Sequence, residues 1–109
     1  MPEGQTGQRI DVYETRRFSK ALAKLPLDLL KAVEDEIDAV IANPAIGEQK
    51  KRDLRFLRVH KFLLSNQWML LGYSWVENRL ELYLLSLGTH ENFYQRQKTY
   101  RKADLKLIE

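Results

Sequence analysis

The sequence contains no cysteine. Disulfide bonds and thiolate metal sites are therefore excluded, and packing alone must stabilise the fold. No apolar run approaches the ~18 residues that a membrane span requires, and the N-terminus lacks the apolar segment of a signal peptide. The absence of cysteine is compatible with a reducing cytoplasm, where we expect the protein to lie.

Several motifs that mark cofactor and metal enzymes are missing as well. The chain has no nucleotide-binding glycine loop, no Walker lysine, no HExxH helix and no G-x-S-x-G elbow. Its two histidines, His60 and His90, have no cysteine or helical carboxylate pair beside them that would complete a metal site. We therefore expect neither a cofactor nor a metal.

The composition is that of one small globular domain. The chain has 109 residues, of which 44% are hydrophobic and 30% charged, and a chain of this size buries only a modest core. We expect residues 1–8 to form a flexible arm, residues 9–103 to form the domain, and residues 104–109 to be a C-terminal tail.

Charge is unevenly distributed, although the net charge is only +3. Residues 50–61 and 94–106 are strongly basic, whereas residues 28–38 are mostly acidic. One basic and one acidic side is typical of nucleic-acid binding and also suits an acidic protein partner, while solvated surface is the simpler alternative. The candidate phosphate-binding residues are Lys50, Lys51, Arg52, Arg55, Lys61 and Arg96.

Periodicity predicts a strand and then a helical hairpin in the first half of the chain. Residues 9–14 alternate as a short strand. Thr15 can cap a helix whose apolar residues recur at spacings of four and three, and Pro26 ends this helix and suits the first turn of the next. The second helix carries an apolar stripe and stops at Asn43-Pro44. The stripe consists of Leu30, Val33, Ile37, Val40 and Ile41.

The second half predicts a three-stranded meander followed by a basic helical tail. The strands are expected at Leu54–Leu64, Gln67–Val76 and Leu80–Leu87, with tight turns at the S-N and E-N pairs between them. The expected class is α+β, an antiparallel-rich sheet with the 16–42 helical pair on a single face. In the first meander strand, alternation places Leu57, Val59 and Leu63 toward the helices and Arg58, His60 and Phe62 on the opposite face.

That opposite face is the candidate site, since it would carry cationic and protonatable groups. RNA can be cleaved without metal when the ribose 2′-hydroxyl attacks the adjacent phosphate. One group must then accept a proton, a cation must stabilise the phosphorane, and an acid must protonate the leaving 5′-oxygen. Histidine and tyrosine can move the protons, while Arg58 and Lys61 can hold the charge.

Three segments give the chain a family resemblance: D-L-R-F-L-R-V-H-K-F, Q-W-M-L-L-G-Y and L-L-S-L-G-T-H-E-N-F-Y, which begin at Asp53, Gln67 and Leu84. Together with the order of elements, they resemble a ParE-like branch of the RelE/ParE superfamily of bacterial type II toxins. The similarity runs from about Phe18 to Lys102. It implies a bacterial cytoplasmic toxin held inactive by an acidic antitoxin.

The resemblance also suggests catalytic roles. Arg58 occupies the position of a strand arginine that contacts the scissile phosphate in mRNA-cleaving members. His90 resembles a histidine that some members use for proton transfer, and Tyr94 lies near the place of a catalytic tyrosine, although it follows the histidine by four residues. His60 is a candidate from its predicted face alone.

Each candidate has a structural alternative. His60 can simply bond to Gln67 or Trp68 across the hairpin, and His90 can cap the tail helix or fix the turn after Gly88. Tyr94 and Phe93 can anchor that helix to the sheet. Strand aromatics, including Trp68, can stack on bases but in small domains are usually core.

Three function classes remain open. The first is a ribosome-dependent mRNA endonuclease, favoured by the two histidines and the basic segment. The second is a DNA gyrase inhibitor that needs no acid or base, favoured by the ParE-like resemblance. The third is a non-toxic member that only binds its antitoxin. RelE-like and ParE-like proteins share a fold but not an activity, so the fold cannot choose between these classes.

Overall fold

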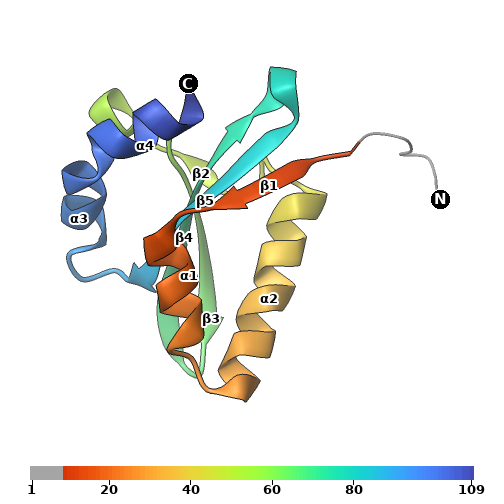
Figure 1. The fold of residues 1–109 in the computed structure, drawn as a ribbon. Coiled ribbons are helices and arrows are strands. Elements are labelled where there is room, and N and C mark those ends of the chain that lie inside the picture. Colours follow the sequence, from red (N-terminus) through yellow and green to blue (C-terminus); the bar gives the residue numbers. More distant parts are fainter. Residues whose placement is uncertain (1–8) are drawn as a thin grey trace.

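A computed structural model describes residues 9–109, so the expected arm at residues 1–8 lies outside the described part of the chain. The class is mixed α+β, with one five-stranded sheet, as the sequence predicts (Figure 1). The elements follow in the order β1 (Asp11–Glu14), α1 (Arg16–Ala23), α2 (Leu27–Ala42), β2 (Glu48–Gln49), a 3₁₀ turn (Arg52–Leu54), β3 (Arg58–Leu64), β4 (Gln67–Val76), a second 3₁₀ turn (Glu77–Arg79), β5 (Glu81–Thr89), α3 (Phe93–Thr99) and α4 (Arg101–Ile108).

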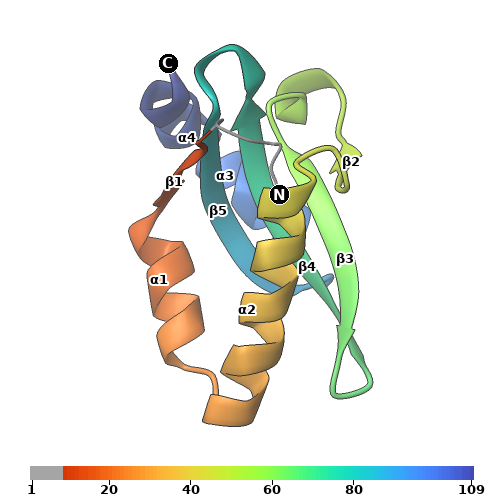
Figure 2. The same cartoon turned by 90° about the vertical axis from the view of Figure 1, so that its right-hand side faces the viewer.

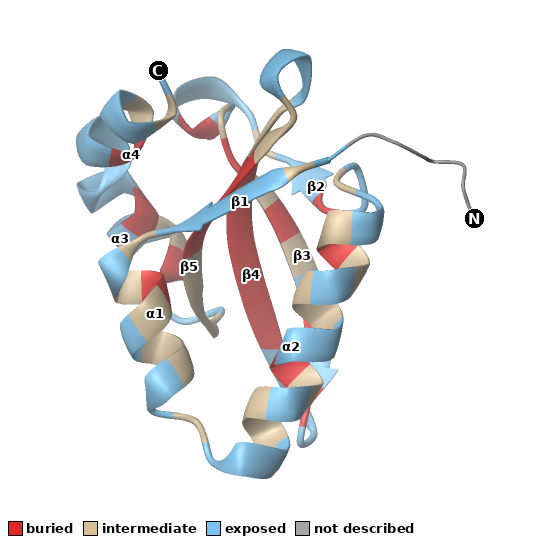
Figure 3. Cartoon of the chain, turned by 45° about the vertical axis from the view of Figure 1, so that its right-hand side comes forward, coloured by how far each residue is buried: buried red, intermediate tan, exposed pale blue. Residues whose placement is uncertain are grey.

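The sheet has the order β1-β5-β4-β3-β2. β1 runs parallel to β5, and the other neighbours are antiparallel. Figure 3 shows that β4, in the middle, is buried along most of its length, whereas β1 is exposed. β1 pairs only with Glu81–Leu84, so among the described residues the later part of β5 has no strand on that side.

The helical hairpin forms where the caps predict it. The Thr15 hydroxyl accepts a hydrogen bond from the Phe18 amide at 3.1 Å and so caps α1. Pro26 precedes the first residue of α2, and Asn43 follows its last. Within residues 9–109, neither this hairpin nor any other helix combines the length and the apolar character that membrane crossing demands.

Of the two tight turns predicted in the meander, the first is confirmed and the second is longer than expected, and the first strand starts later than predicted. Ser65 and Asn66 both have positive φ, 52° and 67°, which is the geometry of a two-residue type I′ hairpin. The connection at Glu77 is longer, because a 3₁₀ turn there ends in Leu80 with φ 52°. The predicted start of the first meander strand at Leu54 is wrong, since the chain makes a 3₁₀ turn first and β3 begins at Arg58.

The predicted hairpin covers one face of the sheet. α1 and α2 pack on a core that includes Phe18 and Val33 from the helices and Leu71, Tyr73 and Leu82 from the strands. Figure 2 shows both helices in front of the sheet. Burial of these apolar side chains is the main stabilising force of this layer.

The other face also carries helices, and the sequence analysis assigned the basic helical tail to neither face. A second cluster unites Leu57, Leu70, Tyr83 and Leu85 with Phe93 of α3. Gly72 makes this contact possible, because a Cβ at this position would lie 2.9 Å from Phe93 Cζ. The basic tail therefore folds back on the sheet as α3 and α4.

A buried polar network ties these C-terminal helices to α1 and β5. Asp104, only 2% exposed, accepts hydrogen bonds from both terminal nitrogens of Arg17 at 3.0 and 2.6 Å. It accepts another from Gln97, which in turn accepts one from Ser86. The expected boundary after residue 103 thus falls inside α4, next to the residue that fixes this helix.

Replacing Arg17 by alanine should destabilise the protein by about 3 kcal/mol, because it leaves Asp104 as a buried, unpaired charge. Urea denaturation of Arg17→Ala and Arg16→Ala provides a matched comparison, since Arg16 is the exposed neighbour on the same helix. Equal stability of the two variants would show that the ion pair does not hold the tail.

Candidate functional site

The predicted facing of β3 is inverted in the structure. Phe62 lies in the core under α1 and α2, whereas Val59 packs in the cluster beneath α3. Leu63 contributes to neither cluster and is 56% exposed. Alternation failed here because apolar residues occur at both phases of the strand, and both faces of this sheet are partly covered.

The inversion moves Arg58 and His60 away from the expected site. The Arg58 guanidinium donates hydrogen bonds to the carbonyls of Ala45 and Gly47, at 3.3 and 2.7 Å, and so braces the loop after α2. His60 Nε2 lies 2.7 Å from Glu36 Oε1 of α2, and the ring stacks on Phe62. Neither side-chain partner proposed for His60 across the hairpin is used.

Other predicted residues do converge, in a cleft of about 550 Å³ beside the open edge of β3, called here the first cleft. β2 pairs only with Arg58 and Val59, so the strand edge beyond them has no neighbour among the described residues. The cleft brings the loop after α2, β3 and the start of α3 together. Its lining residues are Ile46, Glu48, Lys50, Val59, His60, Lys61, Leu70, His90 and Tyr94.

The polar groups of the first cleft are close enough to act together. The rings of His90 and Tyr94 meet edge to face, with centroids 5.8 Å apart. Lys50 Nζ lies 5.0 Å from the centroid of the Tyr94 ring. Among the described residues, this is the place where an exposed histidine, a tyrosine and two lysines share one cavity.

Lys50 is held as a cation. Its Nζ donates to Glu48 Oε1 at 2.6 Å. This hydrogen bond raises the pKa of Lys50, Tyr94 adds to the shift, and the same contact lowers the pKa of Glu48. A phosphate entering the cleft would therefore meet a permanent positive charge on Lys50. It would compete with the Glu48 carboxylate for this charge.

The remaining predicted phosphate ligands lie elsewhere. Lys51, Arg52 and Arg55 are exposed at the 3₁₀ turn that follows Lys50 in the chain, and they do not line the first cleft. Arg96 projects from α3 into a different cavity. The basic segment at residues 50–61 is thus divided between the cleft, the turn and the structural contact of Arg58.

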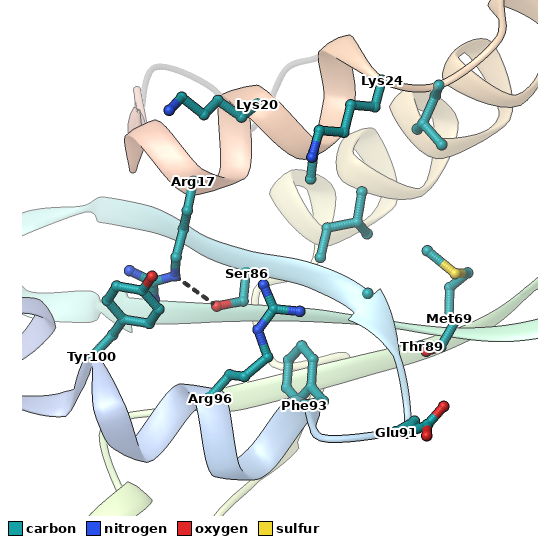
Figure 4. A pocket seen from close by; sticks show the side chains of 14 residues that line it. Arg17, Lys20, Lys24, Met69, Ser86, Thr89, Glu91, Phe93, Arg96 and Tyr100 are labelled. Atoms are coloured by element: carbon teal, nitrogen blue, oxygen red, sulfur yellow. Dashed lines mark hydrogen bonds between the residues drawn. The ribbon is translucent and has the colours of Figure 1, made fainter.

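This different cavity, the second cleft, lies between α1 and α3 along the unpaired end of β5 and has a volume of about 390 Å³ (Figure 4). Sequence analysis did not predict it, because its basic residues come from helices far apart in the chain. Four cations and one acid line it, and Tyr100 stacks on Arg17 at 4.2 Å. Its charged residues are Arg17, Lys20, Lys24, Glu91 and Arg96.

Sequence reasoning also undervalued Trp68, which was expected in the core. Its side chain is 50% exposed, and Lys61 Nζ lies 4.8 Å from its ring centroid. Phe93, by contrast, is buried as a core anchor, in keeping with its structural alternative. Residues 9–109 contain no cluster of three histidine or carboxylate side chains able to hold a metal.

Besides Arg58, a buried tyrosine fastens the loop that carries Glu48 and Lys50 of the first cleft. The buried Tyr73 hydroxyl donates to the Pro44 carbonyl at 2.7 Å and accepts from the Gly47 amide at 2.9 Å. Burial raises the pKa of Tyr73. The loop is thus anchored from below by a phenol that must stay neutral.

The Tyr73→Phe variant should lose about 1–3 kcal/mol of stability, since the buried Gly47 amide would lose its partner. The folded-state pKa is raised, so the stabilising contribution is complete below the unfolded value near pH 10 and is lost as pH rises above it. Denaturation between pH 8 and 11 should therefore show a smaller alkaline loss in this variant. Tyr13→Phe, which removes an exposed hydroxyl, is the control; equal alkaline loss in Tyr73→Phe and wild type would contradict the assignment.

Comparison with known proteins places this geometry in a family. Among solved structures, the intact RelBE toxin-antitoxin complex of E. coli has a chain that superposes with a TM-score of 0.61 at 19% identity, covering 76% of this chain and 99% of that one. A mutant of E. coli RelE in the free state gives 0.62 at 18% identity, covering 80% and 90%. The RelBE2 complex of Mycobacterium tuberculosis gives 0.63 at 19% identity, covering 74% and 98%.

At these identities the structural matches establish the fold and not the activity. The search of curated proteins returned no significant match. The family model for the ParE-like toxin of type II bacterial toxin-antitoxin systems, however, matches residues 12–98, most of the chain. The protein belongs to the ParE-like toxin family of type II toxin-antitoxin systems, within the RelE/ParE superfamily.

Proposed function

We propose that this toxin is a metal-independent endoribonuclease that cleaves mRNA on the ribosome. The observation that carries the proposal is the convergence of Lys50, Lys61, His90 and Tyr94 in the first cleft. A protein that only blocks a partner needs no proton-transfer groups. An RNA-cleaving site needs a cation and two such groups, and this cleft supplies both kinds.

The chemistry is internal transesterification. The ribose 2′-oxygen loses its proton and attacks phosphorus, the bond to the 5′-oxygen breaks, and the products are a 2′,3′-cyclic phosphate and a free 5′-hydroxyl. We assign proton donation to the leaving oxygen to His90, which is exposed in the cleft. Lys50 and Lys61 stabilise the additional charge on the phosphorane.

The choice of base follows from the contacts of the other candidates. His60 borders the first cleft, but its Nε2 is engaged by Glu36 of α2, so it is less available than Tyr94 to take a proton there. Tyr94 lies against His90 and Lys50. We therefore propose Tyr94 as the group that accepts or orients the 2′-hydroxyl proton.

The ribosome would supply the alignment that this site lacks. The neutral phenol of a tyrosine is a poor proton acceptor. Turning the 2′-hydroxyl into line with the leaving oxygen is a positioning effect that can contribute roughly 7–11 kcal/mol. We accordingly propose that free mRNA is cut far more slowly than mRNA bound to a ribosome.

The His90→Gln variant should cleave mRNA about 10²–10⁴-fold more slowly, the range expected for loss of a general acid, while its ribosome affinity is retained. Single-turnover cleavage on programmed ribosomes measures the rate. Because glutamine keeps the size and polarity of the side chain, His60→Gln is a matched control and should have the smaller effect. Unchanged cleavage by His90→Gln would remove this histidine from the chemistry.

Lys61→Ala should cost about 2.7–4 kcal/mol in the barrier, as expected when one preorganised charge donor is lost. Arg58→Ala should slow cleavage less than Lys61→Ala, because Arg58 does not line the first cleft and acts on it only through its hydrogen bonds to the Ala45 and Gly47 carbonyls. Thermal unfolding of both variants controls for loss of fold. If folded Arg58→Ala is inactive and Lys61→Ala is active, the resemblance-based role of Arg58 is correct and our reassignment is wrong.

Gyrase inhibition is the second candidate, and the ParE-like family match favours it. It predicts that His90→Gln and Tyr94→Phe keep full toxicity, since binding a protein requires no proton transfer. Mapping of mRNA ends in translating cells, with plasmid supercoiling measured in parallel, separates the two. Intact mRNA alongside altered supercoiling would favour the gyrase reading.

An acidic antitoxin is the proposed partner under either activity. Several similar structures are toxin-antitoxin complexes, one of them of E. coli RelE with an antitoxin peptide. In this chain, the basic linings of both clefts would attract an acidic segment. The unpaired end of β5 and the groove beside it suit an added strand or an amphipathic helix.

A further inference from the structure

On the sheet face that α3 partly covers, the end of the β3–β4 hairpin is exposed. Trp68 and Leu63 lie directly opposite each other on β4 and β3, and both are about half exposed, at 50% and 56%. Neither residue belongs to the clusters that hold the two helical layers. A tryptophan in such a position contributes little to the core, so its presence calls for another explanation.

The open surface continues directly into the first cleft. Lys61, Leu70 and Gly88 form the next row across β3, β4 and β5. Lys61 and Leu70 line the first cleft, and a Cβ placed on Gly88 would meet nothing within 4 Å. The row of Trp68 and Leu63 is therefore followed, one row along the sheet, by residues that line the cavity containing His90.

Lys61 joins the two regions chemically. Its Nζ lies 4.8 Å from the Trp68 ring centroid, and the residue also lines the first cleft. An aromatic face beside a mobile cation matches the repeating unit of single-stranded nucleic acid, in which each base is attached through its sugar to a phosphate.

We propose that Trp68 is a base-stacking subsite for single-stranded RNA, placed next to the cleft in which the phosphate is cleaved. The choice of RNA rests on the proposed function. One base would stack on the indole, and Lys61 would move from the ring to the adjoining phosphate. This exchange is favourable because an exposed cation–π contact is weaker than base stacking.

Charge favours nucleic acid over an apolar protein segment at this position. Lys61 lies against Trp68 and lines the first cleft together with Lys50, and exposed Lys51, Arg52 and Arg55 follow Lys50 in the chain. Stacking does not discriminate strongly between bases, so the subsite would position mRNA without dictating its sequence. It would thus add affinity for RNA without contributing to the chemistry.

Fluorescence can isolate this residue, because the chain has only two tryptophans and Trp75 packs against the α1–α2 core. In the full-length Trp75→Phe protein, a seven-nucleotide adenosine-rich RNA at low salt should quench Trp68 emission. The same oligomer with abasic sites keeps its phosphates and should quench far less. Equal quenching by both oligomers would overturn the proposal, as would absence of quenching by the intact RNA.

Matched variants can be compared by their affinity for the labelled RNA, measured by fluorescence anisotropy. Trp68→Leu should weaken binding about tenfold or more, whereas Trp68→Phe should retain most of it, since phenylalanine keeps an aromatic face. Trp75→Phe is the control for loss of a tryptophan on the opposite layer. Unchanged binding by Trp68→Leu would overturn the subsite.

Ribosome-programmed cleavage separates this proposal from the proposed function. Slower cleavage by Trp68→Leu at subsaturating protein, restored at saturation, supports the subsite. Normal cleavage by Trp68→Leu at all concentrations overturns the subsite and leaves the endonuclease intact. RNA quenching without any cleavage by wild type would leave the subsite standing and refute the endonuclease. Loss of gyrase inhibition in Trp68→Leu without an effect on RNA binding would instead make this patch a protein-docking surface.

Discussion

The buried ion pair between Arg17 and Asp104 links parts of the protein that lie far apart in the sequence. Through Gln97 and Ser86 it ties α3 and α4 to α1 and β5. Phe93 then packs where Gly72 leaves room for its ring. Because α3 follows His90 and carries Tyr94, the same contacts determine where these two side chains stand relative to β3. The first cleft depends on the tail being held in place.

This arrangement gives the sheet two unequal faces. The α1–α2 hairpin covers one face, while α3 and α4 cover only part of the other (Figures 1 and 2). The uncovered remainder holds Trp68 and Lys61, and it adjoins the first cleft with His90 and Tyr94. Part of this face is exposed because α3 and α4 are short. The proposed RNA-binding residue Trp68 and the proposed cleavage site in the first cleft therefore lie next to each other.

Local signals in the sequence predicted local structure well. Thr15, Pro26 and Asn43 mark helix boundaries because capping depends on a few adjacent residues. The turn at Ser65-Asn66 follows from the tolerance of its residues for positive φ. The facing of β3 was not predictable in this way, because Val59 and Phe62 are both apolar and each finds a helix layer to pack on.

Only part of the candidate site was predicted, because the facing of β3 decides which of its side chains reach the site. His90, Tyr94, Lys50 and Lys61 meet as functional groups. Arg58 contacts the loop after α2 instead, and His60, although it borders the first cleft, is engaged by Glu36 of α2. The second cleft and the exposed Trp68 depend on long-range packing, for which the sequence has no local signal. The family match fixes the toxin class, and the fold it shares with RelE structures supports more than one activity.

The most direct test of this account is a structure of the toxin on a ribosome with mRNA made uncleavable by 2′-O-methylation at the A-site codon. We predict that the scissile phosphate lies within hydrogen-bonding distance of Lys61 Nζ and the His90 ring, on the face partly covered by α3. An mRNA phosphate held by Arg58 beside the loop after α2, or a ribosome without bound toxin, would contradict it.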